Sequence, residues 1–249
     1  MQTAPLRRFI ALDQPLGWLE DISVQFLSQY KAISITPDSF TLDPQLNAQE
    51  VAAWLYKAAL DMRAAGLIQG WRNENYSVFA PTPEGDLDLS HPLFELERAA
   101  FRRFGLTSRA VHINGYTSAG ELWIGQRASS KATDPNRLDN LAAGGISAGE
   151  AVWDCMIREL AEEAGVPLWI AQNASYQGSI RSSRVEADGT QDEILYIYDL
   201  LLPQDFVPNN RDGEMAEFRL YPFAAIDAAL GHFTADAALV TQSFLKQLR

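Results

Sequence analysis

Residues 144–166 read GGISAGEAVWDCMIRELAEEAGV. Apolar residues recur in this stretch every three or four positions, a spacing that predicts an amphipathic helix over residues 148–164. Glu159, Glu162 and Glu163 occupy positions i, i+3 and i+4 of that helix. Their carboxylates therefore lie on one helix face, separate from the apolar stripe that packs into the core.

Three neighbouring carboxylates repel one another unless a cation lies among them. Donors that are all oxygen favour Mg²⁺, with Mn²⁺ as the second choice, over zinc. Such a cation can clamp diphosphate oxygens, orient a water molecule and neutralise charge as a P–O bond breaks. We expect Glu159, Glu162 and Glu163 to hold the metal and to serve catalysis. The glycine turn at Gly144 should bring a backbone carbonyl to the metal as a further ligand.

A charge run such as RELAEE is in most proteins a solvated helix face, but the complete spacing with its flanking glycines favours a metal site. Ser147 and Glu150 have the spacing of a capping box, which gives Glu150 a structural interpretation. Arg158 lies one helical turn from both Asp154 and Glu162. We therefore expect Arg158 to orient carboxylates rather than to catalyse.

The spacing G-x5-E-x7-R-E-U-x-E-E-x-G-U, with U aliphatic, is complete from Gly144 to Val166 and resembles the Nudix box. The resemblance implies a Nudix hydrolase (a pyrophosphatase) with an α/β/α sandwich and a mixed sheet. It also implies Mg²⁺-dependent attack of water on a diphosphate joined to a small organic group. A glutamate from a late loop usually adds a metal ligand or the base in such enzymes, and Glu214 matches that position.

The resemblance extends to one subgroup, the Nudix portion of fused thiamin pyrophosphokinases. It is carried by the stretches WRNENY, VHINGY, LWIGQR, KATDPNRLDN and DGE. The subgroup implies oxidised or damaged thiamin diphosphate as the substrate, converted to the monophosphate and phosphate. One departure is Pro135-Asn136, where the subgroup usually carries Pro-Gly. Asparagine tolerates the left-handed backbone conformation, so the turn is expected to survive.

Four residues outside the box are candidates for substrate binding. Arg127 and Lys131 could hold phosphate oxygens as charged donors, or they could be ordinary surface cations. Asp139 and Asn140 directly precede the glycine turn. They either shape that turn by hydrogen bonds or touch the substrate.

The composition excludes several classes of protein. Twenty Lys and Arg face 32 Asp and Glu, a net charge of −12, which argues against nucleic acid and anionic membranes as partners. Cys155 is the single cysteine, so an intrachain disulfide and a cysteine-based zinc site are excluded. No apolar run is long enough for a signal peptide or a membrane span. We expect a soluble, cytoplasmic enzyme that binds a small diphosphate, and a homodimer is among the states the sequence allows.

After Gly105 the sequence pattern changes to strands separated by one long helix, which predicts two domains. Residues 1–105 are expected to form a small N-terminal α+β accessory domain, and residues 106–249 the Nudix domain. Helices are expected at 18–30, 48–66, 92–105 and 235–248. Strands are expected at 76–80, 109–114, 121–127, 193–202 and 217–221.

Three other functions remain open. The same chemistry could act on ADP-ribose or a nucleoside diphosphate sugar. The fold could also serve as a non-catalytic binding module, although the intact carboxylate set argues against that. An allylic-diphosphate isomerase of the same superfamily would need a catalytic cysteine, for which Cys155 on the packed helix is poorly placed.

Overall fold

Two units of the chain have hydrophobic cores of their own. The computed structural model describes residues 6–131 and 133–248. The first unit comprises Met1–Ser108, Ser147–Gly149 and Ser182–Glu193; the second comprises Arg109–Ile146, Glu150–Arg181 and Ile194–Arg249. The first unit therefore includes segments that come late in the sequence.

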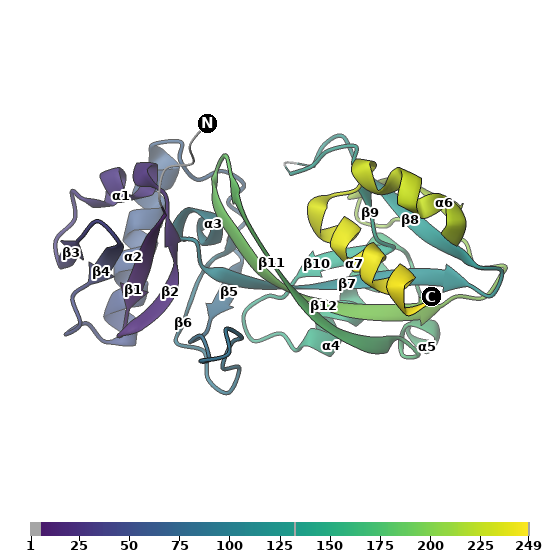
Figure 1. Ribbon diagram of the computed structural model, residues 1–249, viewed down its shortest axis with the longest axis horizontal. Coiled ribbons are helices and arrows are strands. Elements are labelled where there is room, and N and C mark those ends of the chain that lie inside the picture. The colour runs from purple at the N-terminus through teal and green to yellow at the C-terminus, as the bar shows by residue number, and fades with distance from the viewer. Residues whose placement is uncertain (1–5, 132, 249) are drawn as a thin grey trace. The chain divides into compact units, whose positions relative to one another are not determined.

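The first unit contains a four-stranded sheet of order β2-β1-β4-β3 and a separate β5-β6 pair (Figure 1). Its strands are β1 (Arg7–Ala11), β2 (Gln14–Leu19), β3 (Ile33–Ile35), β4 (Ser39–Leu42), β5 (Asn75–Val78) and β6 (Phe94–Glu97). Its helices are α1 (Asp21–Leu27), α2 (Ala48–Ala64), the 3₁₀ turn η1 (Arg98–Ala100) and α3 (Phe101–Phe104). This mixture confirms an N-terminal α+β part.

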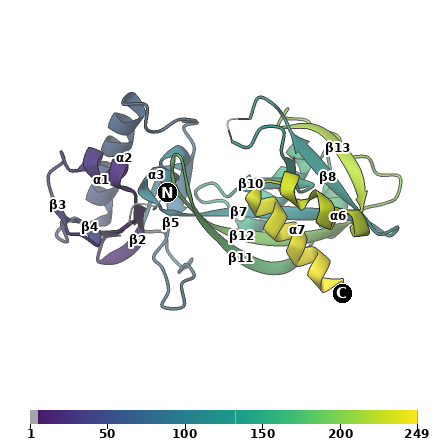
Figure 2. The same ribbon diagram turned by 45° about the horizontal axis from the view of Figure 1, so that its top comes forward.

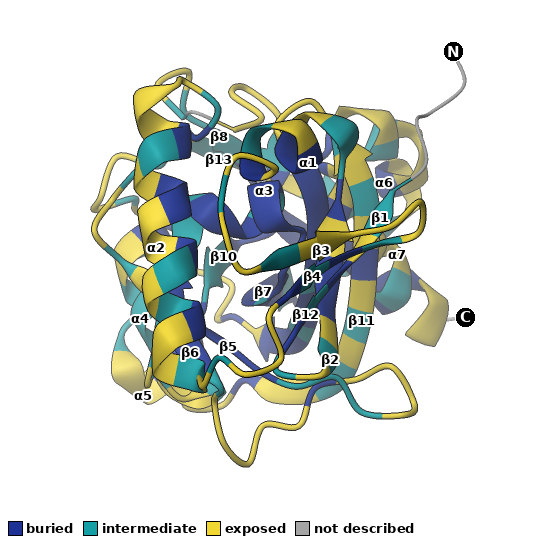
Figure 3. Ribbon diagram, turned by 90° about the vertical axis from the view of Figure 1, so that its left-hand side faces the viewer, coloured by how far each residue is buried: buried dark blue, intermediate teal, exposed yellow. Residues whose placement is uncertain are grey.

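Helix α2 forms where its sequence predicts it. The Asn47 side chain accepts from the backbone N–H of Glu50, and the Glu50 carboxylate accepts from the backbone N–H of Asn47, a complete capping box. Val51, Leu55 and Met62 are fully buried along one face. The opposite face is exposed, as the yellow side of α2 in Figure 3 shows.

Two predicted helices of the first unit are wrong in part. Trp18 lies in β2, so the helix expected at 18–30 shrinks to α1. The helix expected at 92–105 begins instead as strand β6. Phe94 and Leu96 are buried and Glu95 is exposed, the period of two that a strand requires.

The second unit contains a seven-stranded sheet of order β11-β12-β7-β8-β13, with β10 on β7 and β9 on β8. Its strands are β7 (Thr107–Thr117), β8 (Glu121–Arg127), β9 (Leu138–Asp139), β10 (Ala142–Gly145), β11 (Ser175–Glu186), β12 (Gly189–Leu201) and β13 (Met215–Pro222). The tip of the β11–β12 hairpin, residues 182–193, is counted with the first unit.

Five helical segments accompany this sheet. They are α4 (Val152–Glu163), α5 (Leu168–Ala171), α6 (Phe223–Ala229), the 3₁₀ turn η2 (Leu230–His232) and α7 (Ala235–Gln247). Figure 1 and Figure 2 show α6 and α7 together on one face of the sheet.

Alternation along the strands builds three layers. On β7, Val111 and Ile113 pack in one core with residues of α4, whereas Ala110 packs in another with Val240 of α7. On β8, Trp123 joins the α4 side, while its neighbours Leu122 and Ile124 join the side of α6 and α7. Successive strand residues point to opposite faces, so the sheet lies between two helical layers. The expected α/β/α sandwich is confirmed.

The hairpin expected from residues 109–114 and 121–127 is confirmed, because β7 and β8 pair antiparallel through Thr117 and Glu121. Strand β11 was not predicted. Its residues are mostly polar, and only Ser182 among them is buried, so they lack the apolar alternation that marks a strand.

Within the described ranges, none of the helices combines the length and apolar character needed to traverse a lipid bilayer.

Candidate functional site

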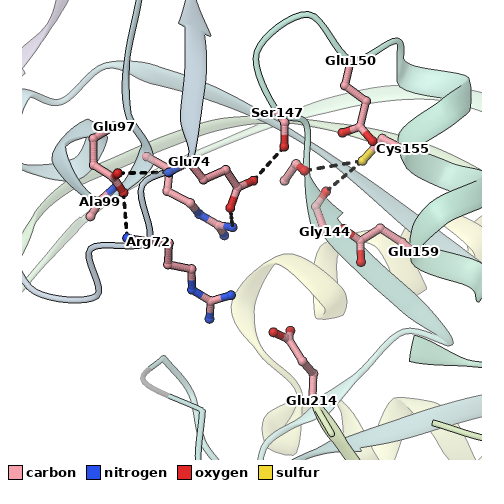
Figure 4. Close-up of polar contacts among 12 residues, drawn as sticks. Arg72, Glu74, Glu97, Ala99, Gly144, Ser147, Glu150, Cys155, Glu159 and Glu214 are labelled. Carbon is pink, nitrogen blue, oxygen red and sulfur yellow. Dashed lines mark hydrogen bonds and ion pairs between the residues drawn. The ribbon is translucent and has the colours of Figure 1, made fainter. Parts of the chain in front are cut away.

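Helix α4 begins at Val152, four residues later than the sequence predicts, and its N-cap Ala151 makes no side-chain capping bond. Gly149 has a φ of +75°, a left-handed conformation that an α-helix cannot include. The predicted Ser147–Glu150 capping box is therefore wrong. The Ser147 hydroxyl donates instead to Glu74, at 2.7 Å, within the first unit (Figure 4).

Arg158 organises the carboxylates around it. Its Nε lies 2.8 Å from Glu150 Oε1, and its Nη1 lies 2.6 Å from Glu159 Oε1 and 3.2 Å from Glu162 Oε2. Of the two acidic residues one helical turn away, Arg158 pairs with Glu162 and not with Asp154 within the described chain. Hydrogen bonding to Glu150 raises the pKa of Arg158 further, so the guanidinium stays charged.

The position of the Glu159 carboxylate depends on the absence of a side chain at Gly144. Gly144 lies in strand β10 and pairs with Val111 of β7, so the tight turn expected at Gly144 is wrong. A Cβ at position 144 would overlap the carboxylate of Glu159, so only glycine lets that carboxylate lie against the strand, as Figure 4 shows. Burial raises the pKa of Glu159, while Arg158 opposes that rise.

Glu163 is the most deeply buried of the predicted ligands, with 1% of its surface exposed. Its Oε2 accepts from the backbone N–H of Ala143 at 2.8 Å. Its Oε1 is buried with no hydrogen-bond partner in the described chain. Burial, with the like charge of Glu159 adding to it, raises the pKa of Glu163 well above its usual range.

The loop before β13 brings two more carboxylates to Glu163. One carboxylate oxygen each of Glu163, Asp212 and Glu214 lie within 4.8 Å of one another. A buried, unpartnered carboxylate oxygen in an all-oxygen cluster fits a hard divalent cation such as Mg²⁺ or Mn²⁺. Glu214 was predicted at this place, and Asp212 was missed, although the triplet DGE contained the signal.

Glu159 and Glu162 lie outside that three-residue cluster. Glu162 is exposed, with 48% of its side chain accessible, and its partner is Arg158. Glu159 is buried and close enough to Glu163 to raise its pKa. The three glutamates of the helix thus differ in environment, which their shared face alone could not reveal.

Arg127 holds the loop that follows β8. Its Nη1 donates to Asp139 Oδ2 at 2.9 Å, and its Nη2 donates to the carbonyl of Thr133 at 2.9 Å. Lys131 forms an ion pair with Glu214, which places an ammonium group at the acidic cluster. Phosphate binding by Arg127 and Lys131 stays a prediction.

Asn140 lies in a buried polar network. Its Oδ1 is 2.9 Å from His112 Nδ1, and its Nδ2 donates to Asn114 and to Thr241, each at 3.0 Å. Asn114 in turn donates to Asp199 at 2.9 Å. These side-chain contacts run to other segments of the core and not to the glycine stretch, which forms strand β10. Contact of Asn140 with substrate stays a prediction.

The predicted turn at Asn136 is present, with a φ of +63°. Ala132 of the KATDPNRLDN stretch lies outside the described residues.

Cys155 is buried and its thiol lies 3.5 Å from the carbonyl oxygen of Gly145. Burial raises the pKa of this thiol, so it stays protonated and unreactive. The cysteine-dependent isomerase therefore finds no support at this position.

Comparison with known families assigns both parts of the chain. The model of the NUDIX domain matches residues 106–243, and the model of a domain of unknown function, DUF4743, matches residues 1–108.

Similar proteins and structures agree with this assignment. Nudix hydrolase 24, chloroplastic, of Arabidopsis thaliana is 41% identical over 186 residues, 72% of this chain and 49% of that protein. Nudix hydrolase 20, chloroplastic, of the same plant is 39% identical over 186 residues, 72% of this chain and 48% of that protein. The chain therefore spans about half the length of the curated relatives it matches.

Among solved structures, the crystal structure of DR0079 from Deinococcus radiodurans has a TM-score of 0.51 at 20% identity. It covers 68% of this chain and 98% of that one. The matched fold, the complete box and the match to more than half of the residues together show that the chain belongs to the Nudix family.

Proposed function

We propose that this protein hydrolyses a diphosphate linked to a small organic group, with Mg²⁺ or Mn²⁺ as cofactor. The substrate we propose is oxidised or damaged thiamin diphosphate, which would yield the monophosphate and inorganic phosphate. The single observation that carries the hydrolase proposal is the buried, unpartnered Oε1 of Glu163 beside Asp212 and Glu214. The choice of thiamin diphosphate rests on the sequence resemblance.

The cation would be held by carboxylates of Glu159, Glu162, Glu163 and Glu214 and by the carbonyl of Gly144. When bound, it neutralises the diphosphate oxygens and polarises the bond to be broken. Arg158 fixes Glu159 and Glu162 so that less side-chain freedom is lost on binding.

In the proposed reaction a water oxygen attacks the terminal phosphorus, and the bond from that phosphorus to the bridging oxygen breaks. The bridging oxygen leaves on the monophosphate. A proton of the water passes to one of the carboxylates of the site, which are those of Glu159, Glu162, Glu163 and Glu214. Lys131, whose ammonium group lies at the acidic cluster beside Glu214, would contact phosphate oxygens.

The test is kcat/KM with Mg²⁺ for oxidised and intact thiamin diphosphate, ADP-ribose and a nucleoside diphosphate sugar. Direct release of inorganic phosphate reports cleavage of a terminal phosphate, whereas the two nucleotide compounds release it only after an added phosphatase. The Glu163→Gln variant, purified in parallel, controls for contaminating phosphatases.

We expect the oxidised thiamin compound to be the best of the four, and to exceed the intact one. One altered polar group can discriminate strongly when its hydrogen bonds are buried. Turnover of either nucleotide compound at least tenfold better would overturn the thiamin assignment and favour a nucleotide-type Nudix pyrophosphatase. No metal-dependent turnover of any of them would favour a binding module.

A further inference from the structure

We propose that Asp212 is a further ligand of the divalent cation and that Asn210 is the residue that positions it. This inference rests on the proposed function for the presence of the cation. It adds two residues of the loop 209–214 that neither the box nor the family match assigns.

The loop is bonded to the end of α4. The backbone N–H of Asn209, the side-chain amide of Asn210 and the backbone N–H of Arg211 donate to carbonyl oxygens of residues 162–164, at 2.9, 3.2 and 2.9 Å. The last carbonyls of a helix have no partners within the helix, so these donors cap it. Gly165 permits the approach, because a Cβ there would lie 2.7 Å from the carbonyl oxygen of Asn209.

One amide group connects the helix end with the acidic part of the loop. The Nδ2 of Asn210 donates both to the carbonyl of Glu163 and, at 2.7 Å, to Asp212 Oδ1. The Oδ1 of Asn210 accepts from the backbone N–H of Gly213 at 2.6 Å. Asp212 Oδ1 also accepts from the backbone N–H of Glu214 at 2.8 Å. All the hydrogen-bonding groups of the Asn210 side chain therefore hold this loop in place.

These bonds leave Asp212 Oδ2 for a cation. No hydrogen bond within the described chain reaches that oxygen, while Oδ1 has two donors. One carboxylate oxygen each of Asp212, Glu163 and Glu214 lie within 4.8 Å of one another, and Lys131 pairs with Glu214. The buried Oε1 of Glu163 independently lacks a partner. A divalent cation would satisfy both oxygens and offset the repulsion.

The test is Mn²⁺ binding to the full chain without substrate, measured by electron paramagnetic resonance and by calorimetry. Asp212→Asn keeps the size and the acceptor oxygen but removes the charge, and we expect it to weaken Mn²⁺ binding about tenfold or more. Asp205→Asn is the matched control: it removes one exposed charge from the same connection, outside the cluster. We expect it to change the affinity less than about twofold.

Asn210→Ala tests the positioning role. We expect it to weaken Mn²⁺ binding in the wild-type background but to add nothing in the Asp212→Asn background, because its effect passes through Asp212. A purely structural role would cost the same in both backgrounds. Melting curves in EDTA establish that each variant is folded at the assay temperature.

Wild-type affinity in Asp212→Asn, or equal losses from Asn210→Ala in both backgrounds, would overturn the inference. A chain that binds Mn²⁺ through Asp212 but hydrolyses none of the diphosphates would overturn only the proposed function.

Discussion

The environment of Glu163 is unfavourable for the stability of the folded chain but favourable for the binding of a cation. Its carboxylate is buried beside other acidic groups, and burial without a compensating partner disfavours the charged form. A structural glutamate would be expected to have both oxygens satisfied. The unpartnered Oε1 is therefore better explained by a ligand than by packing.

Glu163→Gln should separate the effect of Glu163 on stability from its effect on cation binding and turnover. The amide keeps the shape but removes the charge, so we expect turnover to fall by about two orders of magnitude or more, while the melting temperature in EDTA rises. Glu162→Gln, on the exposed side of α4, provides the comparison. Retention of more than about a third of wild-type turnover by both variants at saturating Mg²⁺ would contradict the site assignment.

Gly144→Ala should damage binding more than folding. The added methyl group would meet the flexible end of Glu159 rather than backbone, so the side chain can move aside at small cost in stability. We expect a clear loss of Mn²⁺ affinity and turnover with a melting temperature close to wild type. Gly231→Ala is the control, because its Cβ would meet nothing within 4 Å. Equal activity of the two variants would show that Glu159 need not lie against the strand.

At the scale of elements, the end of α4 and the loop 209–214 form one structure. Gly165 has a φ of +64° and also faces the carbonyl of Asn209 closely. Gly120, in the β7–β8 turn, has a φ of +81° but meets only the Phe223 ring at ordinary contact distance. A comparison of alanine variants at Gly165 and Gly120 therefore separates the cost of backbone strain from the cost of moving the loop.

Gly165→Ala should cost more stability than Gly120→Ala. Both variants place a Cβ in the left-handed region, which costs about 1–2 kcal/mol. Only Gly165→Ala also forces the loop away from the helix end. Urea unfolding followed by circular dichroism measures the difference, and equal midpoints would show that the loop bonds contribute nothing.

Asp199 on strand β12 is a buried carboxylate away from the acidic cluster, and burial raises its pKa although Asn114 donates to it. A raised folded-state pKa means that the folded chain binds more protons than the unfolded chain above about pH 3.8. The contribution of Asp199 to the free energy of unfolding therefore falls as the pH rises from that value through the folded-state pKa.

Asp199→Asn should remove this dependence, since the amide oxygen can still accept from Asn114. We expect the variant to gain stability relative to wild type between pH 4 and pH 7, and the gain should level off once Asp199 is ionised in both states. Urea midpoints across that range test it. A gain that is the same at every pH would mean that the effect is one of packing and not of charge.

At the scale of the whole molecule, the net charge of −12 means that a divalent cation would stabilise the folded chain in a general way, in addition to its proposed role as cofactor. The acidic cluster adds a specific component to that effect, because binding to the folded state alone shifts the unfolding equilibrium. Only the specific component should depend on the glutamates of α4 that are proposed to hold the cation.

Mg²⁺ at ten times its dissociation constant should stabilise the native state by about 1.4 kcal/mol. Melting curves with and without Mg²⁺ at constant ionic strength measure this shift. The Glu159→Gln/Glu163→Gln double variant should lose it. An equal shift in wild type and double variant would reduce the effect to screening of the net charge.

The sequence by itself determined the elements whose signals are local. The capping box at Asn47, the alternation of β7 and β8 and the spacing from Gly144 to Val166 depend on neighbours within a few residues. Local periodicity is set by backbone geometry and needs no knowledge of the fold. The spacing from Gly144 to Val166 resembles the Nudix box, and that resemblance implied the family and the three-layer sandwich.

Only the tertiary structure decided how the three glutamates of α4 differ and which residues join them. Asn210 and Asp212 lie 44 and 46 residues beyond Val166, the last residue of the box, and their approach depends on loop bonds to the end of α4. The late start of α4, the polar edge strand β11 and the assignment of residues 182–193 to the first unit likewise depend on long-range packing. A spacing pattern fixes which side chains share a helix face, but burial and charge at that face are set by segments distant in the sequence, because folding brings them there.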